Sequence, residues 1–236
     1  MEKKQVTNEQ PEKKSALRVV IHSFFFVPLI IAIFAVLIFL VVRIITSEPN
    51  TAQDYLEDVK IGGSTKRWQG AFELSKILSN PKMVPKDDRF ILEMISAFDY
   101  AANDRDSRVR QYLALAMGAT KDSRYVPPLL ESLDSPETEM IMASIHALGN
   151  IGDNDAVQPI INMLDHGEAK VRLQAVISLG KIGDKSSVSF LKKMMADSEV
   201  NVRWDAAVAL AKLENASGKR ILLDLLNRNE RDGRRY

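Results

Sequence analysis

Residues 171–184 decide the fold, and they read VRLQAVISLGKIGD. Three related stretches lie at multiples of 31 residues from them: 109–122 (VRQYLALAMGATKD), 140–153 (MIMASIHALGNIGD) and 202–215 (VRWDAAVALAKLEN). Four copies at one fixed period indicate a repeat protein in which each copy is one structural unit.

The aligned copies share the apolar side of a helix. Positions 1, 9 and 12 of the copies are almost always apolar, and these spacings place them on one side of a helix. Position 8 is always small, which lets neighbouring helices approach closely: Ala116, Ala147, Ser178 and Ala209. Position 10 is glycine in three copies, and we expect these glycines to weaken the helix near its end.

A second helix is predicted after each copy. Asp122, Asp153, Asp184 and finally Asn215 stand where its N-cap should be. The predicted second helices cover residues 125–133, 156–164, 187–195 and 218–226, and a short polar turn leads from each toward the next copy. Each unit is therefore expected to be helix, turn, helix, turn.

The pattern VRxxAxxxLGxIGD, followed by an apolar helix and a new D-x-x-x-V-R, resembles the HEAT repeat. The closest form is the short bacterial one also seen in phycobilisome-lyase-like proteins, and the resemblance covers residues 107–228. It implies an α-solenoid. It does not imply one activity, because similar repeats occur in scaffolds, lyases, chaperones and metal enzymes.

A fifth, atypical copy precedes the others. Residues 67–78 (RWQGAFELSKIL) are similar to residues 203–213 (RWDAAVALAKL), but the offset of 136 residues exceeds four periods by about a dozen. We place the extra residues in 80–88 and in a longer second helix, 87–102. Terminal repeats must cover the end of the stack, so we interpret this copy as a cap.

An apolar segment lies before the repeats. Residues 24–42 carry no charge, and the extended segment 19–45 is long enough to cross a bilayer. A buried core helix and a cleaved signal peptide are the alternatives. A signal peptide normally has an apolar core of about 7–15 residues and a small-residue cleavage site, so we favour an uncleaved signal anchor.

The flanking charges predict the orientation of this segment. Positive residues favour the cytoplasmic side, which places the N-terminus there and the repeats on the periplasmic or extracytoplasmic side of the inner (plasma) membrane. Cytoplasmic repeats are the alternative, because Arg43 opposes this charge difference. Five basic residues precede the segment, and two follow it within about twenty residues: Lys3, Lys4, Lys13, Lys14 and Arg18, against Arg43 and Lys60.

The predicted fold class is all-α: a right-handed α-solenoid of about five HEAT-like hairpins preceded by a single transmembrane helix. A short linker should hold the solenoid near the membrane surface. The predicted organisation is a disordered cytoplasmic tail (1–18), a transmembrane helix (19–45), a linker with a short helix (46–63), the solenoid (64–229) and a charged tail (230–236).

Composition and motifs give no sign of catalysis. With 32 basic and 31 acidic residues, the chain lacks the basic excess of a dedicated nucleic-acid binder. It contains no cysteine, hence no disulfide, cysteine nucleophile or thiolate metal site. Its histidines (His22, His146 and His166) lack the following glutamate that marks HEAT-type metal hydroxylases, and HExxH, GxSxG, P-loop and GxGxxG motifs are absent. We predict no catalytic, cofactor-binding or metal-binding residue, and interpret His146 as a packing residue.

Arginine recurs at position 2 of the copies, and Ile141 interrupts the column. The HEAT resemblance implies that such an arginine pairs with the turn aspartate of a neighbouring repeat, so Arg172 would pair with Asp153 or Asp184. We interpret the resulting ladder as structural rather than anion-binding. Its predicted members are Arg67, Arg110, Arg172, Arg203, Asp122, Asp153 and Asp184.

The predicted function is that of a membrane-anchored scaffold that binds another protein, in or near a membrane complex. Trp68 and Trp204 occupy matching places and suit either packing between helices or anchoring a partner. We expect the second helices to line the concave face. A lyase-like or chaperone HEAT protein acting on a cofactor-bearing client is the alternative. The candidate partner-binding residues are Tyr125, Glu131, Gln158, Asn162, Lys192, Lys193 and Arg220.

Overall fold

The computed structural model describes residues 22–46 and 50–233, and these residues form helices and connecting turns without strands. The chain divides into two compact units at the Pro49–Asn50 bond. The predicted tail, 1–18, lies outside the described residues.

The first unit is one long apolar helix. A π-helical turn, His22–Phe26, leads into α2, Val27–Thr46. The segment Phe24–Arg43 is long and apolar enough to span a membrane, and none of it is buried by protein. Pro28 is the second residue of α2, directly after the π-helical turn, and its lack of a backbone N–H removes one helical hydrogen bond there.

The second unit contains eleven further α-helices within residues 50–233, linked by short 3₁₀ turns. The first helices of the repeats are α4 (Ser64–Ile77), α6 (Arg108–Thr120), α8 (Thr138–Ile151), α10 (Ala169–Ile182) and α12 (Val200–Lys212). The second helices are α5 (Asp88–Tyr100), α7 (Val126–Glu131), α9 (Val157–Asn162), α11 (Val188–Met194) and α13 (Lys219–Gly233), and α3 (Ala52–Ile61) precedes them all. The predicted all-α solenoid of five hairpins is therefore confirmed. Helix α13 includes residues 230–233 of the predicted tail.

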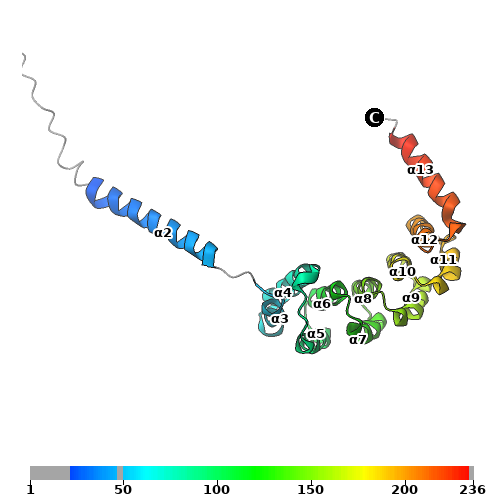
Figure 1. Ribbon diagram of the computed structural model, residues 1–236, viewed down its shortest axis with the longest axis horizontal. Coiled ribbons are helices and arrows are strands. Elements are labelled where there is room, and N and C mark those ends of the chain that lie inside the picture. Colours follow the sequence, from blue (N-terminus) through cyan, green and yellow to red (C-terminus); the bar gives the residue numbers. More distant parts are fainter. Residues whose placement is uncertain (1–21, 47–49, 234–236) are drawn as a thin grey trace, which may run out of the picture. The chain divides into compact units, whose positions relative to one another are not determined.

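The repeats form two layers that bend (Figure 1). Helices α4, α6, α8, α10 and α12 stack along the inner side of the bend, and α5, α7, α9 and α11 lie on its outer side. The expectation that second helices line the concave face is therefore wrong. The first helices line it instead.

Close contact between successive first helices depends on glycine. A Cβ added to Gly118 would lie 2.5 Å from Ala147 Cα, and one added to Gly180 would lie 2.8 Å from Ala209 Cβ. The glycine at position 10 thus packs against the small residue at position 8 of the next repeat. The glycines were expected to weaken the helix end, but their main role is this close approach.

Four equivalent turns end the first helices in the left-handed conformation. Gly152 and Gly183 have φ of 78° and 83°, and the non-glycine residues Lys121 and Glu214 have φ of 60° and 59°. The next residue caps the following 3₁₀ turn, as predicted. In each case its side-chain oxygen accepts a bond from a backbone N–H two residues on: Asp122 from Arg124, Asp153 from Asp155, Asp184 from Ser186 and Asn215 from Ser217.

Helix α3 covers the N-terminal end of the stack. Its Leu56 and Val59 are buried in the core of the second unit. Glu93 of α5 fixes the helix, because its carboxylate accepts hydrogen bonds from Gln53 (3.0 Å), Arg89 (2.8 Å) and Lys60 (3.2 Å). These donors lower the pKa of Glu93 to about 2. An added helix therefore shares the capping role predicted for the first repeat.

Replacing Gly149 by alanine is expected to destabilise the stack. The added Cβ would lie 2.5 Å from Ser178 Oγ and 2.9 Å from Ser178 Cα, so α8 and α10 would have to separate. We expect a loss of about 1–3 kcal/mol in the free energy of unfolding, measured by urea titration in detergent. The matched control is Gly167→Ala, whose Cβ would meet nothing within 4 Å. Equal losses in both variants would contradict this account.

Candidate interaction surfaces

A single turn position precedes each first helix and recurs every 31 residues. Asp104, Ser135, His166 and Asp197 occupy it, six residues before position 2 of the helix. Each side chain accepts a hydrogen bond from the backbone N–H two residues later, over 2.8–3.2 Å. Three chemically different kinds of side chain thus cap the same turn.

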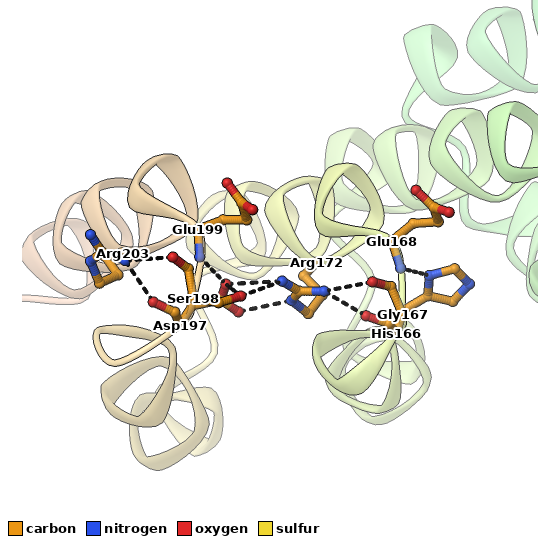
Figure 2. A network of polar contacts seen from close by, with 8 residues as sticks. All are labelled: His166, Gly167, Glu168, Arg172, Asp197, Ser198, Glu199 and Arg203. Carbon is orange, nitrogen blue, oxygen red and sulfur yellow. Dashed lines mark hydrogen bonds and ion pairs between the residues drawn. The ribbon is translucent and has the colours of Figure 1, made fainter.

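Where this turn residue is aspartate, it also binds the arginine of the preceding repeat. Arg172 donates from Nε to Asp197 Oδ2 over 2.8 Å and from Nη2 to Oδ1 over 3.0 Å. Its remaining nitrogen, Nη1, donates to the carbonyls of His166 and Gly167. Figure 2 shows Arg172 between the two turns, so its guanidinium joins consecutive repeats.

The same pairing occurs at the N-terminal end. Arg67 Nη2 lies 2.9 Å from Asp104 Oδ2, as an ion pair without hydrogen-bond geometry, and Arg67 Nε donates to the Val59 carbonyl. The Arg67 and Asp104 side chains are 15% and 8% exposed, comparable with 13% and 6% for Arg172 and Asp197. Both pairs are therefore shielded from water, which makes them stronger than surface ion pairs.

The middle repeats break this ladder. Arg110 faces a hollow of about 130 Å³ that Ser135 also lines, so no carboxylate occupies the turn position opposite it. Its Nε is buried without a hydrogen-bond partner, and its guanidinium stacks 4.6 Å from the Phe98 ring centroid. At the next interface between repeats, Ile141 occupies the arginine position and His166 occupies the turn position where an aspartate would be needed.

The predicted ladder had the wrong acids. Asp122, Asp153 and Asp184 cap 3₁₀ turns after the first helices, and Arg172 pairs with neither Asp153 nor Asp184. The partner belongs to the turn before the next first helix. The sequence signal is that Asp104 and Asp197 lie three periods of 31 residues apart, at the same place before a first helix.

The pair sets the ionisation of its members. Hydrogen bonds from Arg172 hold the pKa of Asp197 below its usual range, and Asp197 in turn raises the pKa of Arg172. Asp197 therefore stabilises the native state in its ionised form. This stabilisation is present above the unfolded aspartate pKa and is lost as pH falls through the lower folded value.

Asp197→Asn is expected to lower the free energy of unfolding by about 1–3 kcal/mol at pH 7, because it removes the charge but keeps the turn-capping oxygen. The difference from wild type should shrink as pH falls below about 4, because the carboxylate then protonates in the unfolded chain first and in the native state only at lower pH. Urea titrations between pH 3 and 7 measure it. A difference independent of pH would contradict the ion-pair role.

The predicted partner-binding residues lie on the outer second helices or the turn before α7, except Arg220, which lies on α13. Tyr125 is 1% exposed, so an outward side chain there is a wrong prediction. It is buried because it ends a 3₁₀ turn whose last residue points into the core, and burial raises its pKa. The other six side chains are exposed: Glu131, Gln158, Asn162, Lys192, Lys193 and Arg220.

A stripe of apolar and aromatic side chains follows the first helices. They occupy positions 3, 4 and 7, opposite the buried side, and we call them the inner surface. Phe72 and Val208 are each 37% exposed, and the others are half-buried. The Phe72 and Tyr112 rings meet edge to face at 5.2 Å, which joins α4 to α6. The inner surface comprises Trp68, Phe72, Tyr112, Leu115, Met142, His146, Leu173, Ile177, Trp204 and Val208.

Basic groups border the C-terminal half of the inner surface. Lys181 donates to Asn150 over 2.9 Å. Burial, and to a smaller extent the charge of Lys212, lowers the pKa of Lys181. Burial, and to a smaller extent the charge of Lys181, lowers the pKa of His146. Near Lys212, burial raises the pKa of Asp205. This edge of the surface therefore favours acidic groups.

Comparison with known families supports the repeat assignment. Residues 96–168 and 157–236 match the family model of HEAT repeats. The chain belongs to the HEAT-repeat family. A comparison with curated proteins finds no match.

Solved structures share the fold of this HEAT-repeat protein. The complex of CpcE and CpcF of phycocyanin lyase from Nostoc sp. PCC7120 matches with a TM-score of 0.63 and 20% identity, over 77% of this chain and 72% of that one. The crystal structure of an engineered protein matches with a TM-score of 0.53 and 19% identity, over 75% and 85%. Such low identities show the fold alone.

Proposed function

We propose that this HEAT-repeat protein is a membrane-anchored scaffold whose inner surface binds another protein. The observation that carries the proposal is the continuous stripe of half-exposed apolar and aromatic side chains on the concave side. Contiguous apolar surface of this kind is typical of interaction sites. Aromatic residues such as Trp68, Tyr112 and Trp204 are the side chains that most often anchor a protein interface.

The solenoid suits this role because its surface is fixed before binding. Interlocked glycine and small residues set the spacing of the first helices, and the arginine–aspartate pairs fix the turns between them. A surface ordered in advance loses less conformational entropy when a partner binds. The Lys181–Lys212 edge adds a preference for acidic segments in that partner.

Membrane attachment rests on α2. Its length and uninterrupted apolar surface suit a bilayer span, and the basic residues before it favour a cytoplasmic N-terminus with extracytoplasmic repeats. The chain has no cysteine, so Ser189→Cys, at an exposed site on α11, provides a single labelling position. Labelling of intact cells by a membrane-impermeant maleimide would support this orientation, and labelling only after lysis would contradict it.

A lyase-like role is the second candidate, favoured by the likeness to the phycocyanin lyase complex. In that case the inner surface would hold a protein that carries a cofactor. Visible absorbance that co-purifies with the protein, and is lost with the inner-surface variants below, would favour it over a scaffold for cofactor-free partners.

The inner surface is tested by charge substitution. Phe72→Glu and Val208→Glu change side chains that are already partly exposed, so the core is retained. We expect each to reduce the amount of cross-linked partner at least tenfold, measured by quantitative mass spectrometry after in-cell crosslinking. The matched control is Leu92→Glu, an exposed leucine on α5 of the other layer. Loss of partner in the control alone, or in no variant, would overturn the proposal.

A further inference from the structure

Arg203 is the last arginine of the ladder, and it is oriented as Arg172 is. Its Nη1 donates to the carbonyls of Asp197 and Ser198 over 2.7 and 2.9 Å. Nη1 of Arg172 donates to the two equivalent carbonyls one repeat earlier, as Figure 2 shows. In Arg172, this arrangement leaves Nε and Nη2 to bind the aspartate of the following turn.

No aspartate occupies the equivalent turn position for Arg203. The residue 31 positions after Asp197 is Arg228, which is basic. Among the side chains that the structure describes, none forms an ion pair with Arg203. The ladder therefore ends with an arginine whose equivalents in two other repeats bind a carboxylate.

A hollow of about 350 Å³ lies at this end of the ladder. Arg203, Arg220 and Trp204 line it, together with Met195, Ile221, Asp224 and Leu225. Arg220, like Arg203, forms no ion pair with any described side chain, and Asp224 is the one acidic residue of the lining. The hollow therefore combines two arginines and one aspartate, a net positive charge, with an aromatic wall.

We propose that this hollow binds an aspartate or glutamate side chain of the partner protein. Nε and Nη2 of Arg203 hold the carboxylate as Arg172 holds Asp197, Arg220 adds a second positive charge, and Trp204 packs against the adjoining partner residues. Bidentate arginine–carboxylate pairs give orientation as well as affinity. This site rests on the proposed scaffold function and extends it by defining what the partner presents at the C-terminal end.

A second copy of this chain does not fit the site. If the N-terminal end of another copy continued the stack, the residue six positions before Arg67 would meet Arg203. That residue is Ile61, which is 76% exposed and carries no charge. A copy that continues the stack in register therefore supplies no acid, and we assign the acid to a different protein.

The test uses the full chain in detergent micelles with Trp68→Phe, which leaves Trp204 as its one tryptophan. The probe is the acetylated and amidated peptide Ala-Asp-Ser-Glu-Val-Asn, a copy of residues 196–201. We expect a saturable change in Trp204 fluorescence. A peptide with asparagine in place of the aspartate should bind at least tenfold more weakly.

Arg203→Gln should abolish the preference for the aspartate peptide, and Arg203→Lys should weaken it, because lysine keeps the charge but not the two-pronged geometry. The matched control is Lys219→Gln, which removes an exposed charge next to Arg220 but outside the hollow and should change affinity less than twofold. Circular dichroism establishes that the variants are folded. Equal affinity for both peptides, or no binding, would overturn the proposal without affecting the inner-surface test.

Discussion

The contact between one repeat and the next determines the rest of this structure. The first helices α6, α8 and α10 each place a glycine, such as Gly149, against a small residue of the following first helix, such as Ser178, closely enough to exclude a Cβ. This contact fixes the spacing between repeats. It explains why the 31-residue period is kept strictly from α6 to α12 while the second helices vary in composition. Because each repeat contacts only its neighbours, stability is built from these interfaces one at a time.

The turn residue before each first helix has two separate roles, one within its own repeat and one between repeats. Asp104, Ser135, His166 and Asp197 all cap the turn before a first helix, and this requires only a side-chain acceptor. Joining the previous repeat requires a carboxylate, which only the aspartates supply. The position-2 arginines thus tie consecutive repeats by charge at both ends of the ladder. The interface between α8 and α10 has other polar contacts instead, among them the Lys170–Glu139 ion pair over 2.6 Å. Arg203, at position 2 of α12, has the same orientation as Arg172 but forms no ion pair with a described side chain.

Much of the fold was predictable, because the repeat pattern is local. The 31-residue period, the helices, the caps at Asp122, Asp153 and Asp184 and the small position 8 follow from spacing and residue type. The partner of Arg172 did not follow, since Asp153, Asp184 and Asp197 all lie within one period of it along the chain. The concave face and the burial of Tyr125 depend on how two layers bend and on 3₁₀ turns, which no single repeat encodes.

The most direct measurement of the central claim is the stability of Ser135→Asp. Ser135 and Arg110 line the same hollow, so this substitution supplies the missing carboxylate to an arginine already in place. We predict that it raises the free energy of unfolding by about 1 kcal/mol at pH 7. We also predict no gain from Ser135→Asn, or from Ser135→Asp combined with Arg110→Met. An equal gain in all three variants, or a loss with Ser135→Asp alone, would contradict the claim that the turn residue decides where the position-2 arginine joins two repeats by charge.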